Sequence, residues 1–287
     1  MRAYKNYKEV KKEAEKRAWG FPVDASRKEL RRSPEHVAFG QTRLGFMKNP
    51  VRKALDYFGV KKSTRPIVIA AGFTGNFARA IEAAGKGRVI FTDLHKPWVT
   101  RAKQGVQLSK TGKDENAKPM GGFVLDMQKP HIDDRKVSAM MSFEPTPVME
   151  NFNKTVLPNL GAKNGFIMAT AGKMFDYSYY NGWAAKTGLK LFGTYGAQVR
   201  ITTAGKATFI QVKIPEKKRK DYLFDRECFE SMRYKKESAG SVAKRLGASE
   251  KRVKDAYRRY NSVMEAKQIE LKRPLVNHYM DYDYKTV

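Results

Sequence analysis

Short apolar runs alternate with helical stretches through the middle of the chain. The runs hold four to six residues and are typical of strands that are buried on both faces. Most of them are separated by stretches with the 3.6-residue apolar spacing of a helix. The runs are Pro66–Ala71, Arg88–Thr92, Gly122–Leu125, Val137–Ser142 and Gly165–Thr170, and the helical stretches are Asn76–Ala84, Pro97–Leu108 and Pro147–Leu157. This alternation predicts an α/β fold with a parallel sheet covered on both sides.

Two further β-rich runs follow the fifth strand. They cover Leu189–Ile201 and Ala207–Ile214, and the segment TTAGK joins them. A link that is short and contains glycine favours an antiparallel hairpin. Five alternating units closed by a β-hairpin differ from the usual order of dinucleotide dehydrogenases. We therefore predict a core domain over residues 66–214, with a terminal antiparallel hairpin.

The flank before this core, residues 1–65, is predicted to be a basic helical extension. One helix is expected from about Tyr4 to Ala18 and a second around Pro50–Phe58, with Pro50 in its first turn. The segments between them are rich in Arg and Lys. They fit either a solvated face or an arm that lies on phosphates.

Charge is the unusual feature of the composition. The chain carries 57 Lys and Arg residues against 29 Asp and Glu, a formal net charge of +28. Such a surface attracts polyanions, and nucleic acid, either DNA or RNA, is the partner that this balance favours. An anionic membrane and a lysine-rich thermophile protein are the alternatives. Thermophile proteins usually balance lysine with glutamate, and acids are too few here for that.

Cysteine and histidine usage narrows the chemistry and the compartment. The single cysteine, Cys228, excludes an internal disulfide and any zinc site built on several cysteines, which fits a reducing compartment. The four histidines show no ligand spacing. No apolar run approaches the roughly 18 residues of a membrane-spanning helix, and the first residues lack the apolar stretch of a secretory signal. We expect a cytoplasmic protein with no metal site and no membrane partner.

The segment IVIAAGFTGNFARAI, with the strand pattern around it, resembles the class I S-adenosylmethionine (SAM)-dependent methyltransferases over about residues 66–214. The resemblance implies a Rossmann-like sheet, SAM as cofactor, and a glycine-rich turn that lets the backbone approach the cofactor. The positions that it assigns to this turn are Ala71, Gly72, Phe73 and Gly75. The family usually has an acid at the end of the strand and glycines two and four residues later. Here Ile69, Ala71 and Phe73 stand at those places, so a tight turn in a fold that has lost its cofactor is the alternative.

Two acids support the cofactor interpretation. Asp93 ends the second strand in VIFTDL, where the family holds the cofactor ribose through a carboxylate. Asp126 follows the third strand in FVLDM, where the family often contacts the adenine amino group. Each alone would also fit ordinary turn chemistry. Ligands of open parallel sheets bind at the carboxyl ends of the strands, which is where both acids fall.

The end of the fourth strand, in MMSFEPTPV, is the predicted reaction edge. Many nucleic-acid amino-methyltransferases place Asp or Asn, two prolines and an aromatic residue here. Phe143 and Glu144 are the candidates in this chain, Phe143 to stack on a base and Glu144 to accept from an amine or act as a base. The motif departs from the family pattern, and Pro145 and Pro147 would equally well stop the strand. Five aromatic residues after the fifth strand, within AGKMFDYSYYNGW, would either stack on a base or pack in the core.

The last part, residues 215–287, is predicted to be a basic helical module. Residues 215–220 (PEKKRK) suggest a charged linker, and AGSVAKRLGASEKRVKDAYR, residues 239–258, resembles the helix-turn-helix family. Gly247 allows the turn and Ser249 can cap the second helix. The resemblance implies that this helix meets DNA through its basic side. The five bases of that side are Lys251, Arg252, Lys254, Arg258 and Arg259. A helical hairpin with a solvated face is the alternative.

Two main functions stay open at this point. The first is a SAM-dependent methyltransferase acting on DNA or RNA. The second is a catalytically inactive, methyltransferase-like nucleic-acid-binding protein of a nucleoprotein assembly, which the altered turn and the unmatched fourth-strand motif favour. A transcription regulator ranks behind both because it would use only the last quarter of the chain. The sequence contains neither a phosphate-binding loop that ends in Gly-Lys-Ser/Thr nor a nucleophile elbow.

Overall fold

A computed structural model describes residues 48–70, 75–94, 96–108, 114–126, 132–143, 156–171, 189–204 and 207–265. Several predictions lie outside these residues: the helix at 4–18, turn positions Ala71, Gly72 and Phe73, Glu144, and the aromatic residues of 175–183. None of the described helices is both long and apolar enough to cross a bilayer.

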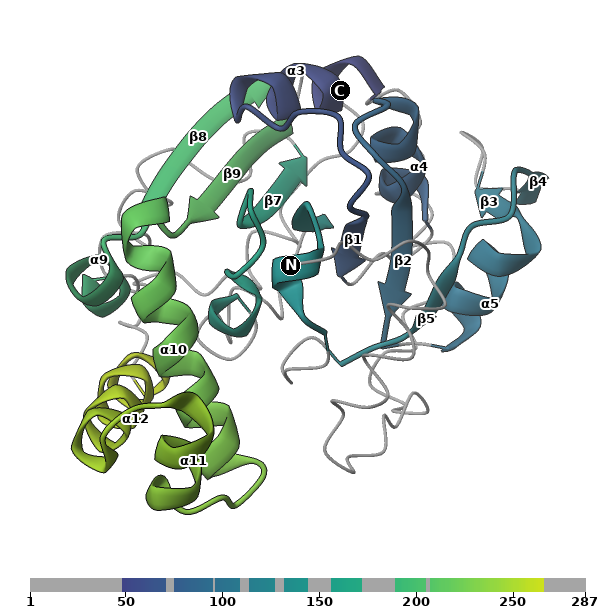
Figure 1. The fold of residues 1–287 in the computed structure, drawn as a ribbon. Coiled ribbons are helices and arrows are strands. Elements are labelled where there is room, and N and C mark those ends of the chain that lie inside the picture. Colours follow the sequence, from purple (N-terminus) through teal and green to yellow (C-terminus); the bar gives the residue numbers. More distant parts are fainter. Residues whose placement is uncertain are drawn as a thin grey trace.

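The sheet has seven strands in the order β5-β2-β1-β6-β7-β9-β8 (Figure 1). The strands are β1 (Ile67–Ala70), β2 (Val89–Asp93), β5 (Gly122–Val124), β6 (Ala139–Phe143), β7 (Phe166–Ala171), β8 (Gln198–Ala204) and β9 (Ala207–Lys213). The first five of these are parallel, whereas β9 runs antiparallel to both β7 and β8. The predicted fold class, an α/β fold with a Rossmann-like parallel sheet and a terminal antiparallel hairpin, is confirmed.

Helices cover the sheet and extend from its end. They are α3 (Lys48–Tyr57), α4 (Asn76–Ala83), α5 (Lys96–Gln104), α9 (Leu189–Tyr195), α10 (Glu216–Arg233), α11 (Ala239–Leu246) and α12 (Glu250–Met264), with 3-10 turns η3 (Asp134–Lys136) and η4 (Leu157–Asn159). Alternation along β1 separates two hydrophobic clusters. Ile67 and Ile69 pack with residues of α3 and α4, whereas Val68 and Ala70 belong to the cluster that includes Tyr222 of α10. The continuous apolar runs therefore correspond to strands with two covered faces.

Two predicted elements are wrong in part. Residues 189–195, expected in a strand, form α9, and the hairpin begins only at Gln198. Leu191 and Tyr195 are both buried and lie four residues apart, which is helical spacing. The helix expected to end at Leu108 stops at Gln104, because Gly105 has a φ of 73°. After it, β3 (Val106–Leu108) pairs with β4 (Asp114–Asn116) in a small second sheet.

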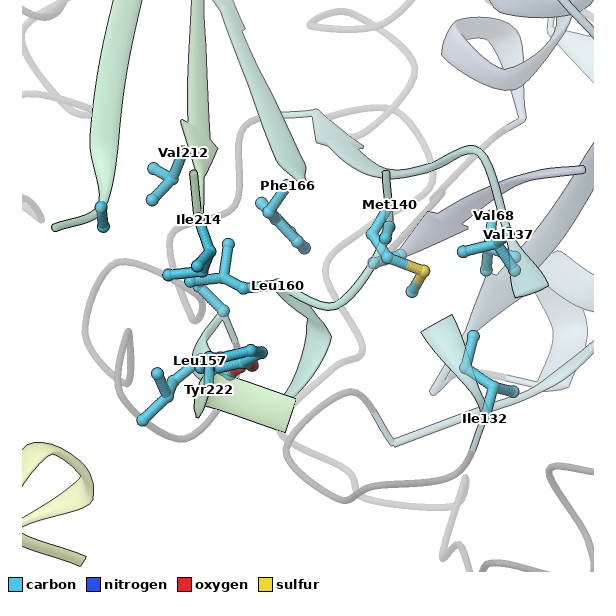
Figure 2. Packing of buried hydrophobic residues seen from close by; sticks show 14 of the residues in the cluster. Val68, Ile132, Val137, Met140, Leu157, Leu160, Phe166, Val212, Ile214 and Tyr222 are labelled. Atoms are coloured by element: carbon cyan, nitrogen blue, oxygen red, sulfur yellow. The ribbon is translucent and has the colours of Figure 1, made fainter. Parts of the chain in front are cut away.

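The prediction of a charged linker over residues 215–220 is wrong, because residues 216–220 form the first turns of α10, which is separated from the end of β9 by two residues. Tyr222 explains why the chain does not leave the core here. Its ring lies among the apolar side chains of Leu157, Leu160 and Ile214 (Figure 2), and its hydroxyl donates to the Leu157 carbonyl. Figure 1 shows α11 and α12 beside the far part of α10, away from the strands.

A buried ionic cluster fixes α10 to the amino-terminal edge of the parallel strands. Arg226 Nη1 donates to Asp134 Oδ2 and to the Pro158 carbonyl, each over 2.7 Å. Asp134 Oδ2 also accepts from the Gly161 amide at 2.5 Å. Asp134 lies before β6, and Pro158 and Gly161 lie before β7. Burial alone would lower the pKa of Arg226. The negative charges of Asp134 and Glu230 outweigh that effect, so the pKa of Arg226 lies well above its ordinary value.

Candidate functional site

The turn that follows β1 reaches α4 through Gly75. Gly75 has a φ of 82° and precedes the first residue of α4, whose amino terminus has no side-chain cap. A Cβ added at Gly75 would meet only the Phe91 ring, at an ordinary 3.8 Å. Its left-handed backbone, rather than a lack of space, therefore makes glycine the suitable residue. An uncapped helix start offers backbone N–H groups to a ligand that binds at the carboxyl end of β1.

The two predicted acids lie at the carboxyl ends of neighbouring strands. Asp93 is the last residue of β2, is 6% exposed, and pairs in register with Val124 of β5. Asp126 comes two residues after Val124 and is half-buried. The Thr92 hydroxyl donates to the Ile69 carbonyl over 2.5 Å and ties the end of β2 to β1. The predicted placement of both acids is confirmed, and their contacts with a cofactor stay predictions.

The strand order changes direction between β1 and β6. Strands β2 and β5 lie on one side of β1, whereas β6 and β7 lie on its other side. Open α/β sheets bind ligands in the crevice at this switch point. Ala70 and Ser142 face each other in register at the carboxyl ends of the two strands. The sequence analysis did not single out Ser142. The feature that could have identified it is a single hydroxyl side chain within the otherwise apolar strand AMMSF. Phe143 ends this strand, while Glu144 falls outside the described residues.

The second candidate surface is formed by α11 and α12. Gly247 has a φ of 61° and ends α11, and the Ser249 hydroxyl caps α12 by accepting from the Arg252 amide at 3.2 Å. Val253 and Ala256 are fully buried. Helix α11, a turn at Gly247 and helix α12 are therefore present, and membership of the helix-turn-helix family stays a prediction. That this segment binds nucleic acid stays a prediction.

The five predicted bases of α12 divide into two groups, and two of them contact α10. Arg259 makes a bidentate ion pair with the buried Asp225, with N–O distances of 2.7 and 2.8 Å. The Tyr195 hydroxyl donates to the same carboxylate at 2.9 Å. Arg252 places its guanidinium 4.6 Å from the centre of the Phe224 ring. These two arginines therefore join α12 to α10, and their contact with phosphates stays a prediction.

Lys251, Lys254 and Arg258 form the second group, which we call the basic face of α12. All three are exposed. Lys254 pairs with Glu250 at 2.5 Å and Arg258 with Asp255 at 3.4 Å, both within the helix. Exposed pairs of this kind contribute little and exchange easily. The three bases can therefore turn to an approaching phosphate without leaving a buried acid unpaired.

The structure also limits other chemistry in the part of the chain that it describes. Cys228 is buried between the last helices, and burial, with the charges of Asp225 and Glu227, raises the pKa of its thiol to about 11. It is therefore a neutral packing residue rather than a nucleophile. Within the described ranges, no three His, Cys, Asp or Glu side chains gather in a group that could hold a metal ion.

Comparisons with known proteins return similar folds only. No family model matches the chain, and no curated protein matches it. Among solved structures, an O-methyltransferase family protein from Burkholderia thailandensis has a TM-score of 0.41 and 11% identity, covering 72% of this chain and 70% of that one. A SAM-dependent methyltransferase from Aquifex aeolicus has a TM-score of 0.36 and 18% identity, covering 67% and 99%.

A chain from the complex of the Haloferax volcanii Trm112 methyltransferase activator with a methyltransferase has a TM-score of 0.42 and 12% identity, covering 63% of this chain and 98% of that one. Similarity at this level carries no argument about activity. The fold assignment depends instead on the strand order and the register of the strands in this chain.

Proposed function

We propose that this chain is a SAM-dependent methyltransferase that acts on nucleic acid. The observation that carries the proposal is the place of Asp93, a nearly buried carboxylate at the end of β2, one strand away from the switch point between β1 and β6. A carboxylate at that place can accept hydrogen bonds from both hydroxyls of a ribose. Gly75, with its left-handed backbone, and the uncapped start of α4 lie at the end of the turn that follows the neighbouring strand, β1.

The described residues fit SAM by their chemistry. Asp93 would hold the ribose, Asp126 would accept from the adenine amino group, and Gly75 would let the backbone approach the amino-acid end. The bound cofactor would supply the sulfonium methyl group. Phe143 and Glu144 would position the acceptor, so that the chain accelerates transfer mainly by alignment.

The nucleic-acid part of the proposal is supported by charge. The net charge of +28 favours a polyanion, and the basic face of α12 gathers three exposed bases on one helix. Lys and Arg on phosphates position a protein without reading sequence. DNA and RNA both offer these phosphates, so the proposal covers either.

Calorimetric titration with SAM and with S-adenosylhomocysteine tests the cofactor site. We expect micromolar binding to the full chain, and a loss of about tenfold or more in Asp93→Asn, because a charge-assisted hydrogen bond is lost. Asp133→Asn is the matched control: this buried carboxylate pairs with Arg135 at the opposite edge and should leave both affinities unchanged. A folded chain that binds neither ligand would contradict the proposal and favour the non-catalytic nucleic-acid-binding protein.

A further inference from the structure

Ser142 carries a buried hydroxyl that the fold itself does not satisfy. Its side chain is fully buried, and Oγ has no hydrogen-bond partner among the described residues. Burying a hydroxyl without a partner costs about 1–3 kcal/mol, so native structures keep few such groups, and each needs an explanation. An alanine would fill the same place in this apolar strand without that cost.

The position of Ser142 indicates what the hydroxyl is for. It is the fourth residue of β6 and faces Ala70, the last residue of β1, in register. These two strands bound the switch point, where open sheets bind their ligands. Ala70 contributes only a methyl group at this place. Of the two residues paired at these strand ends, Ser142 therefore carries the polar side chain.

Ser138 gives the contrast within the same chain segment. It lies just before β6, at the opposite edge of the sheet, and is also buried. Its hydroxyl accepts from Asn164 Nδ2 at 3.2 Å. The serine at the amino edge thus has a partner within the protein, whereas the serine at the ligand-binding edge does not.

We infer that the Ser142 hydroxyl is a cofactor-positioning group that contacts the amino-acid end of bound SAM, an inference that rests on the proposed function. That end carries an ammonium and a carboxylate, and a serine hydroxyl can accept from the first and donate to the second. The hydroxyl is thus retained at a cost to the free protein and is satisfied when the ligand binds.

The test compares Ser142→Ala with Ser138→Ala in the full chain. Thermal unfolding of the free protein should show a midpoint raised by about 2–4 °C in Ser142→Ala, because an unsatisfied hydroxyl is removed, and a lowered midpoint in Ser138→Ala. Calorimetry should show SAM and S-adenosylhomocysteine binding about tenfold more weakly to Ser142→Ala. 5′-Methylthioadenosine, which lacks the amino-acid end, should bind both variants and the unmodified chain alike.

Each other outcome overturns the inference. A lowered midpoint in Ser142→Ala would mean that the hydroxyl is already satisfied in the free protein, for example by water. Unchanged affinities, or an equal loss for 5′-methylthioadenosine, would remove Ser142 from the amino-acid end while leaving the proposed function intact. An unmodified chain that binds none of the three ligands would overturn the proposed function, and the inference with it.

Discussion

Arg226 and Asp134 form an ion pair that is buried on both sides and joins α10 to the segment before β6. The guanidinium is 4% exposed and the carboxylate side chain is fully buried, with 2.7 Å between Nη1 and Oδ2. Glu230 lies 3.2 Å from Arg226 Nε on the same helix. Two acids thus surround one base inside the protein, so the loss of Arg226 would remove the buried positive charge that both carboxylates face.

Arg226→Gln should therefore lower the free energy of unfolding by about 3–5 kcal/mol. Arg258→Gln is the matched control, since its pair with Asp255 is exposed and should contribute less than about 1 kcal/mol. Urea unfolding followed by circular dichroism measures both. Equal, small losses in the two variants would mean that α10 does not depend on this pair.

A glycine beside the same carboxylate gives a second prediction. A Cβ at Gly161 would lie 2.2 Å from Asp134 Oδ1, whereas a Cβ at Gly193 in α9 would meet nothing within 4 Å. Gly161→Ala should destabilise the fold by more than about 2 kcal/mol because the clash displaces Asp134. Gly193→Ala should stabilise it by about 0.5–1 kcal/mol because alanine favours a helix. Changes of the same sign in the two unfolding curves would contradict the packing described around Asp134.

The salt dependence of nucleic-acid affinity distinguishes binding through the basic face of α12 from binding through the net charge of the protein. Replacing Lys251, Lys254 and Arg258 together with Gln should flatten the dependence of log K on log salt by up to about 2.7 on duplex DNA, at about 0.9 per lost phosphate contact. The control replaces Lys217, Lys218 and Lys220, three exposed lysines of α10, and removes the same charge. Equal slopes for the two triple variants would assign binding to net charge rather than to α12.

Stability should fall between about pH 9 and 11. The thiol pKa of Cys228 is raised from 9.0 to about 11, so in this range the folded state keeps a proton that the unfolded state releases. The stabilisation is complete below pH 9 and is lost as the pH rises through the folded value. Burial also raises the pKa values of Tyr195 and Tyr222, which act in the same direction above pH 10. Denaturant titrations at each pH should show a smaller decline in Cys228→Ala, and an identical decline would remove the thiol as a cause.

The sequence could predict the strands because their apolar runs are short and continuous. It predicted the start and end of α4 from Asn76 and Ala84 closely, since an apolar face repeats there at helical spacing. It missed α9, whose residues 189–195 are as apolar as a strand. Periodicity over so short a segment cannot distinguish a helix from a strand. The burial of both Leu191 and Tyr195, four residues apart, fits a helix.

The candidate sites were predictable to different degrees. Asp93 and Asp126 follow apolar runs, so their place at the carboxyl edge depends only on the strand pattern. The contacts of Arg252 and Arg259 could not be predicted, because their partners Phe224 and Asp225 lie on α10, a helix that the sequence analysis did not predict. The first residues of α10 are mostly Lys and Arg, and its first buried side chain is Tyr222, so the start of the helix shows no apolar periodicity.

Helices α10 and α12 contribute side chains to the same hydrophobic cluster as the strands. Tyr222 and Tyr260 from these helices lie in the same cluster as Phe166 of β7 and Ile210 of β9. Unfolding of these two helices would therefore expose apolar side chains of the core cluster to water. A polyanion held on α12 and a cofactor held at the strand ends would each raise the melting temperature of the whole protein.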